Sequence, residues 1–108
     1  MDLVRRGEVW LAALDPTVGS EIQKTRPVLV VSPNDLNEYL RVVTIVPLTS
    51  GSHPAPFRRP VNFGGRDGLL LLEQIRSVDK RRLIRRVGLV ETAVLNETLS
   101  ALQRYFAP

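Results

Sequence analysis

Glycine and proline divide most of this chain into short apolar runs, and this punctuation restricts the fold more than any other feature. Seven glycines and eight prolines are spread over 108 residues. Several short strands separated by Gly/Pro turns are typical of a small antiparallel sandwich or barrel. We therefore expect strands at residues 8–14, 26–32, 42–48, 57–61, 69–78 and 83–89, with 69–78 forming either one long strand or a bent pair.

Local signals refine this prediction. Residues 26–32 are apolar at consecutive positions, which predicts a strand buried on both faces. Pro27 lacks an N–H and belongs at the start of a strand, whereas Pro60 predicts an edge strand. Turn residues predict a turn at 62–68 and short helical turns at 33–39 and 79–82.

Apolar side chains recur at helical spacing in the last part of the chain. Between Val94 and Phe106 they occupy one face, and polar side chains take the other. Thr92 is the candidate N-cap. This helix should close the open side of the barrel or pack beside its sheet. The expected fold class is mainly β with a C-terminal α-helix, in a single domain of residues 1–108.

Composition excludes several classes of protein. The hydrophobic fraction of 44% is too high for a disordered chain. There is no cysteine, and the single histidine, His53, cannot form a histidine metal cluster. The longest apolar runs are too short to span a bilayer, and no signal peptide precedes the first strand. We expect a cytoplasmic protein with no disulfide, membrane segment, metal or cofactor.

Arginine supplies most of the positive charge. The formal net charge is +4, and thirteen arginines stand against two lysines, Lys24 and Lys80. Guanidinium groups form forked hydrogen bonds with phosphates and stack on bases. The charge therefore favours an RNA, DNA or acidic-protein partner. Solubility alone is the alternative explanation.

Two polar residues lie at the ends of predicted strands. Arg26 stands where the polar loop at residues 15–23 meets a strand, so its charge is held in place. Thr49 follows the strand at 42–48 and begins a turn. A solvated arginine and a turn-capping hydroxyl are the ordinary interpretations. If the two strands are neighbours, however, both side chains can converge on one phosphate.

A third cluster, Glu73, Gln74 and Arg76, interrupts an apolar strand. Glutamine reads base edges and arginine pairs with phosphates. The alternative is an internal Glu–Arg ion pair at a strand bend. Trp10 is expected to anchor the core. His53 is expected to be exposed, and whether His53 or Glu73 takes part in proton transfer stays open.

No carboxylates are paired at a spacing typical of a metal nuclease, and no glycine loop is built to cradle phosphate. A phosphodiesterase with this sequence would therefore be metal-independent. RNA permits that chemistry because its own 2′-hydroxyl can attack the adjacent phosphate. A fixed arginine would stabilise the charge that develops on the phosphorus.

Five blocks of sequence carry a resemblance to a known family. They are RGEVW at 6–10, DPTVGSE at 15–21, RPVLVVS at 26–32, PLTS at 47–50 and LLEQIRSVDKRRL at 71–83. In this order and spacing the chain closely resembles the MazF/PemK (Kid) toxins. The resemblance implies an SH3-like antiparallel β-barrel and a sequence-specific, ribosome-independent endoribonuclease. It also implies a homodimer that binds single-stranded RNA, or the acidic and apolar tail of an antitoxin, in a groove across its interface.

The resemblance implies roles for particular residues. Arg26 would stabilise the phosphorane and take part in proton transfer, and Thr49 would hydrogen-bond the scissile phosphate. Kid-branch relatives carry an arginine and an aspartate where this chain has Leu71 and Glu73, and the missing arginine favours the Arg26/Thr49 set. The expected RNA-binding residues are Thr17, Ser20, Glu21, Lys24, Glu73, Gln74 and Arg76.

Two other functions stay open at this point. A non-enzymatic toxin of the same fold, resembling the gyrase poison CcdB, would need neither Arg26 nor Thr49 and would bind its target through the C-terminal end of the helix. A plain nucleic-acid-binding barrel would bind RNA without cutting it. The ribonuclease would leave 2′,3′-cyclic phosphate and 5′-hydroxyl ends.

Overall fold

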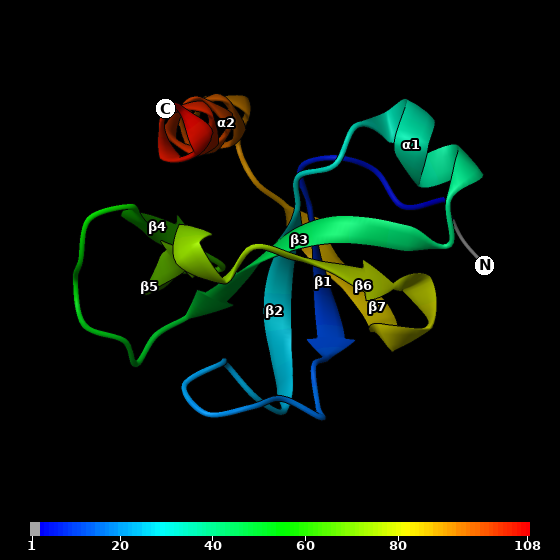
Figure 1. Cartoon of the computed structure of the whole chain (residues 1–108), viewed down its shortest axis with the longest axis horizontal. Coiled ribbons are helices and arrows are strands. Elements are labelled where there is room, and N and C mark those ends of the chain that lie inside the picture. The colour runs from blue at the N-terminus through cyan, green and yellow to red at the C-terminus, as the bar shows by residue number, and fades with distance from the viewer. Residues whose placement is uncertain (1–2) are drawn as a thin grey trace.

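In the computed structural model, which describes residues 3–108, one curved antiparallel sheet lies beneath a C-terminal helix (Figure 1). The predicted fold class, mainly β with a C-terminal α-helix, is confirmed. The elements are β1 (Glu8–Ala13), β2 (Thr25–Val30), α1 (Asn34–Tyr39), β3 (Val42–Thr49), β4 (Arg58–Phe63), β5 (Arg66–Leu71), the 3-10 turn η1 (Leu72–Gln74), β6 (Arg76–Asp79), the 3-10 turn η2 (Lys80–Arg82), β7 (Leu83–Leu89) and α2 (Thr92–Phe106).

Strand β3 is the centre of the sheet. The strand order is β4-β5-β3-β2-β1-β7, and β6 also pairs with β3. Ile45 pairs with Val30 of β2 on one edge and with Arg76 of β6 on the other. Farther along β3, Leu48 and Thr49 pair with β5. The strand that ends at Thr49 therefore lies between β2 on one side and β5, η1 and β6 on the other.

The sheet curves like a barrel but is not closed by hydrogen bonds within residues 3–108. Its two end strands, β4 and β7, form no ladder with each other. They approach through side-chain packing, because the Phe63 ring occupies the space beside Gly88. A Cβ atom at Gly88 would lie only 2.6 Å from Phe63 Cζ. The expected SH3-like barrel is thus an open, curved sheet whose edges meet through one aromatic ring.

Of the two forms predicted for residues 69–78, the bent pair is confirmed, as β5 and β6 separated by η1. Two other local predictions need correction. The predicted turn at 62–68 is a two-residue hairpin turn, because Gly64 and Gly65 both adopt positive φ, at 62° and 79°, and β4 and β5 continue to either side. Thr92 is not the N-cap: α2 begins at Thr92, and Glu91 precedes it without a side-chain capping bond.

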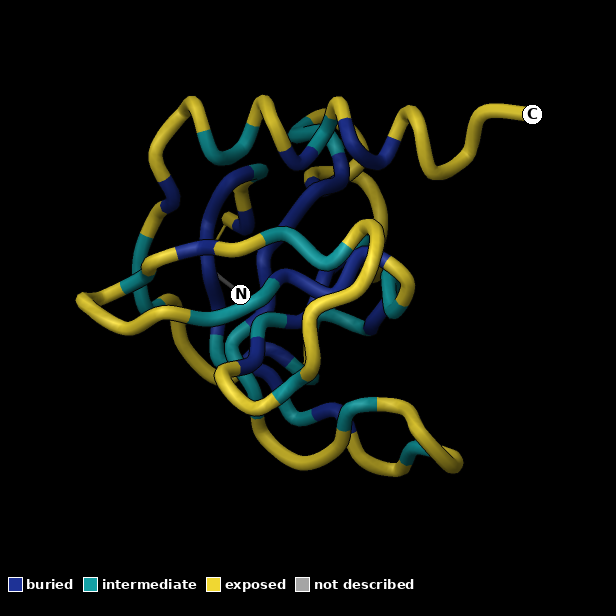
Figure 2. The backbone as a smooth tube through the Cα atoms, turned by 90° about the vertical axis from the view of Figure 1, so that its left-hand side faces the viewer, coloured by how far each residue is buried: buried dark blue, intermediate teal, exposed yellow. Residues whose placement is uncertain are grey.

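Two hydrophobic cores lie on opposite faces of the sheet, as alternation along β1 and β2 requires. Trp10 and Val28 are buried in one core, which confirms Trp10 as a core residue. Val9 and Leu29 are buried in the other, where Leu102 of α2 covers the sheet. Figure 2 shows this second layer: the buried side of α2 faces the sheet, and its exposed side faces away. Strand β2 is therefore buried on both faces, as predicted.

The helical turns predicted at 33–39 and 79–82 are present as α1 and η2. In η2, the backbone N–H of Arg81 donates to Asp79 Oδ1 at 2.8 Å, and its side chain donates to the same oxygen at 3.0 Å. These hydrogen bonds hold the pKa of Asp79 below its usual value. The acid therefore stays ionised where it caps the turn that leads into β7.

Replacing Asn37 with alanine should lower the free energy of unfolding by about 2 kcal/mol, because buried polar groups would lose their partners. Asn37 is fully buried, accepts from Ser32 Oγ at 2.6 Å and donates to the Ser32 carbonyl at 3.0 Å. Chemical denaturation checks the value. The control is Asn96→Ala, at an exposed position of α2. If that variant lost as much free energy of unfolding as Asn37→Ala, the loss could not be assigned to the hydrogen bonds that anchor α1.

Candidate active site

Register brings the two candidate catalytic residues together. Val28 of β2 pairs with Pro47 of β3 in the antiparallel ladder. Continued by two residues toward the start of β2 and the end of β3, the same register would bring Arg26 beside Thr49 on one face. The sequence predicted that Arg26 and Thr49 could converge on one phosphate only if their strands were neighbours, and β2 and β3 are neighbours in the sheet.

Both residues line one open cleft with a volume of about 590 Å³. The β1–β2 loop forms one wall, and the beginning of the β3–β4 loop forms another. Hydroxyl, amide and cationic side chains dominate the lining. The lining residues are Ser20, Ile22, Gln23, Lys24, Arg26, Thr49, Ser50, Gly51, Ser52, Arg58, Leu71 and Gln74.

Arg26 and Thr49 both keep donors for a ligand. Arg26 is half-buried, and its Nε donates to the Gln23 carbonyl at 3.2 Å. None of the ion pairs formed within residues 3–108 involves Arg26. Thr49 is buried, and its Oγ1 accepts from the Gly51 N–H at 3.3 Å, so its own proton is not used in that bond. A guanidinium and a hydroxyl are thus held beside each other and ready to donate to an anion.

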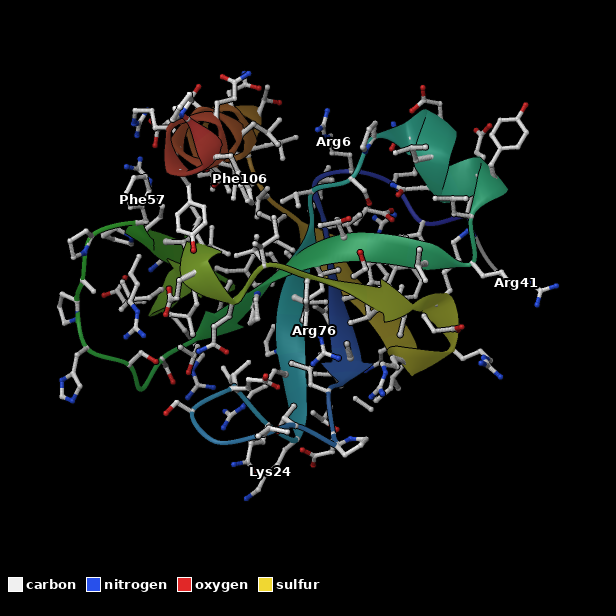
Figure 3. The ribbon with its side chains drawn as sticks, viewed as in Figure 1. Arg6, Lys24, Arg41, Phe57, Arg76 and Phe106 are labelled. Atoms are coloured by element: carbon white, nitrogen blue, oxygen red, sulfur yellow. The ribbon has the colours of Figure 1, made fainter. Side chains whose placement is uncertain are left out.

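The end of the β1–β2 loop is fixed by its backbone. Lys24 has a φ of 66°, a conformation that residues other than glycine rarely adopt. Its N–H donates to Asp15 Oδ1 at 3.0 Å, and its carbonyl accepts from the Leu14 N–H at 2.9 Å. Asp15 and Leu14 therefore hold this residue at the mouth of the cleft, where Figure 3 shows the Lys24 side chain extending from the loop. Backbone strain of this kind is often found at functional sites.

Gln74 holds the loop against η1. Its Oε1 accepts from the Ile22 N–H at 2.7 Å, and its Nε2 donates to the Ser20 carbonyl at 3.5 Å. The side chain predicted to read bases therefore also positions the wall of the cleft. Within the loop, Glu21 accepts from the Val18 N–H at 3.2 Å and closes a turn.

Most of the other predicted RNA-binding residues lie outside the main cleft, in a neighbouring hollow or in the β1–β2 loop. Glu21, Glu73, Gln74 and Arg76 line a second hollow of about 370 Å³, which shares Ile22 and Gln74 with the main cleft. Figure 3 shows Arg76 at the centre of that view, and its side chain is half-buried. Thr17 is half-buried in the β1–β2 loop and lines neither hollow. His53 is exposed, as predicted, and does not line the cleft.

Sequence reasoning missed one cation in the cleft, Arg58. Its Nη2 lies 2.5 Å from Glu73 Oε2, so the ion pair considered for Glu73 involves Arg58 and not Arg76. Arg58 is the cross-strand partner of Leu71 in the β4–β5 hairpin. Reading Gly64-Gly65 as a two-residue turn would have given this register.

Neither a metal cluster nor a membrane helix is found in the part of the chain that the structure describes. No three histidine, aspartate or glutamate side chains of residues 3–108 gather closely enough to hold a metal ion. No helix within the same residues has the length and apolar character needed to cross a membrane.

Comparison with known proteins places this chain in a family. Residues 5–106 match the pattern of the PemK-like, MazF-like toxins of type II toxin–antitoxin systems. The endoribonuclease PemK of Escherichia coli is 38% identical over 92% of this chain and 79% of its own length.

Solved structures agree with this match. MazF (Form-I) from Deinococcus radiodurans superposes with a TM-score of 0.86 at 26% identity, covering 97% of both chains. A MazE–MazF complex (Form-I) from the same organism gives 0.73 at 27% identity, again covering 97% of both chains. The resemblance stated from the sequence is thereby confirmed, and the chain belongs to the PemK-like, MazF-like toxin family of type II toxin–antitoxin systems.

Proposed function

We propose that this toxin is a sequence-specific endoribonuclease that cuts single-stranded RNA in the cytoplasm, independently of ribosomes and without a metal ion. The observation that carries the proposal is that Arg26 and Thr49 line the same cationic cleft. The curated relative PemK, an endoribonuclease, supports the same activity. The RNA-binding role that we assign to Ser20, Lys24 and Gln74 is supported by their position in the lining.

The chemistry follows from what the cleft can donate. The 2′-oxygen of the RNA forms a bond to phosphorus while the bond from phosphorus to the 5′-oxygen breaks. A base takes the proton of the 2′-hydroxyl and an acid returns one to the 5′-oxygen, a transfer in which the family resemblance gives Arg26 a part. The products carry 2′,3′-cyclic phosphate and 5′-hydroxyl ends. Arg26 stabilises the extra negative charge on the phosphorane, and the Thr49 hydroxyl donates to a non-bridging oxygen. The main contribution that we assign to Arg26 is electrostatic.

The partner that we propose is an antitoxin whose acidic and apolar C-terminal segment occupies the same cleft. MazF of Deinococcus radiodurans is found in complex with MazE. In this chain, Lys24, Arg26 and Arg58 supply positive charge to the cleft, and Ile22 and Leu71 supply apolar contacts. Such a lining suits a peptide that carries both carboxylates and apolar side chains. Bound there, the peptide would exclude RNA.

We also propose a homodimer, and light scattering at micromolar concentration should give twice the chain mass of 12.1 kDa. An apolar groove of about 550 Å³ between α1 and α2 includes Leu36, Ile75 and Phe106, and a second copy would cover it. Phe106 is 65% exposed, so Phe106→Glu should favour the monomer without unfolding the chain. A monomeric wild type would contradict the dimer, and a dimeric Phe106→Glu protein would contradict this face.

The activity is tested by incubating the purified protein, free of antitoxin, with a long single-stranded RNA in EDTA. Discrete fragments are expected, and their ends would define the recognition sequence. DNA of the same sequence should stay intact because it lacks the 2′-hydroxyl. Intact RNA, from protein shown to be folded by circular dichroism, would overturn the proposal and favour a protein-binding toxin of this fold.

A further inference from the structure

Arg58 is a cation in the cleft to which no motif assigned a role. It is the first residue of β4, directly opposite Leu71 of β5, and both residues line the cleft that holds Arg26 and Thr49. The Arg58 side chain is only 22% exposed. A guanidinium that is mostly covered and still lines an open cleft is restricted in the directions from which it can receive a ligand.

The contacts of Arg58 fix its orientation. Nε and Nη2 donate to Glu73 Oε2 at 2.9 and 2.5 Å, and Nη1 donates to the His53 carbonyl at 2.9 Å. The guanidinium is thereby tied to η1 on one side and to the β3–β4 loop on the other. A guanidinium carries five N–H donors, so donors on Nη1 and Nη2 remain after these bonds.

The ion pair spans the wall between the two hollows. Arg58 lines the main cleft, whereas Glu73 lines the adjoining hollow with Glu21 and Arg76. The carboxylate that holds the guanidinium therefore belongs to a residue that does not itself line the cleft of Arg26 and Thr49. An anion entering the main cleft would meet the unused donors of a positioned, planar group, which suits phosphate oxygens.

We propose that Arg58 is a second phosphate-binding residue of this toxin, and that Glu73 is the positioning residue that holds it. This inference rests on the proposed ribonuclease function, since the phosphate belongs to the RNA in the cleft. Arg58 binds a phosphate oxygen beside the phosphate that Arg26 and Thr49 hold. It thereby keeps the strand in place while the scissile bond is cut.

The next residue along β4 provides a matched control. Arg59 points to the opposite face, where its Nη2 pairs with Glu97 of α2 at 3.2 Å. Its side chain is 35% exposed, and it does not line the cleft. Changing either arginine to alanine removes one positive charge and one ion pair from the same strand. Only Arg58→Ala removes a charge from the cleft.

The experiment compares wild type, Arg58→Ala, Arg58→Lys and Arg59→Ala on two short single-stranded RNAs that contain one mapped cut site. The first is all RNA and reports cleavage. The second carries a single 2′-deoxynucleotide at the cut site, cannot be cleaved, and reports binding at several salt concentrations. Thermal unfolding establishes that each variant is folded.

Arg58→Ala should weaken binding about 10- to 100-fold, the value expected for losing a hydrogen bond to a charged group. The slope of log K against log salt should become shallower by about 0.7, because one phosphate contact is lost. Arg58→Lys should restore the slope, and Arg59→Ala should leave both quantities unchanged.

Equal losses in Arg58→Ala and Arg59→Ala, or an unchanged slope in folded Arg58→Ala, would overturn the role of Arg58 while wild-type cleavage upheld the ribonuclease. If wild type left the all-RNA substrate intact, the proposed function and this inference would fall together.

Discussion

Replacing Arg26 with alanine should lower the single-turnover rate of RNA cleavage by about 10³-fold, the scale observed when an arginine that stabilises a phosphoryl transition state is removed. Arg26 is half-buried and makes one side-chain hydrogen bond, to Gln23, so the fold should survive. Arg26→Lys should recover only a small part of the rate, because lysine keeps the charge and loses the planar fork. The rate is measured at saturating enzyme on a single-site RNA.

The control for this prediction is Arg85→Ala, at an exposed position of β7, which removes the same charge outside the cleft. Its rate should match wild type. If Arg26→Ala cut RNA within a few-fold of wild type, the transition state would not depend on this guanidinium, and the mechanism would be wrong. If it failed to fold, Arg26→Lys would decide the question.

Replacing Thr49 with valine should lower the same rate by about 10²-fold, the effect of losing one donor to a developing negative charge. Valine keeps the size of this 8% exposed side chain and removes only the hydroxyl. Its hydrogen bond from the Gly51 N–H is long, at 3.3 Å, so the loss of stability should stay near 1 kcal/mol. Single-turnover kinetics and chemical denaturation together separate the two effects.

Thr98→Val makes the same change at another buried position, on α2, that lines neither the cleft nor the groove between α1 and α2. We expect a normal rate from that variant. An unchanged rate in Thr49→Val, with the fold intact, would remove the hydroxyl from the mechanism and leave Arg26 as the sole contact that we assign to the scissile phosphate.

The pair Arg26 and Thr49 was predictable because strong local signals place both residues. An apolar run behind Pro27 sets where β2 begins, and the turn after Thr49 sets where β3 ends. Antiparallel neighbours then bring the two ends together. The C-terminal helix was predictable for a similar reason, since its apolar spacing extends over several turns.

Features that depend on long-range pairing were harder to predict. Arg58 enters the cleft only because the Gly64-Gly65 turn aligns β4 with β5, and the longer turn predicted from composition concealed that register. Gln74 can hold the β1–β2 loop only because the chain bends at η1, and the spacing of apolar residues does not predict that bend. The open edge between β4 and β7 depends on the packing of Phe63 beside Gly88, which sequence spacing does not encode.

The measurement that tests the central claim most directly is end-group analysis of one cut. A single-site RNA is cleaved in EDTA, and both fragments are examined by mass spectrometry. Attack by the 2′-hydroxyl in the Arg26/Thr49 cleft predicts a 2′,3′-cyclic phosphate on the upstream fragment and a 5′-hydroxyl on the downstream fragment. A 3′-hydroxyl paired with a 5′-phosphate would mean that water attacks the phosphorus, which would contradict the mechanism.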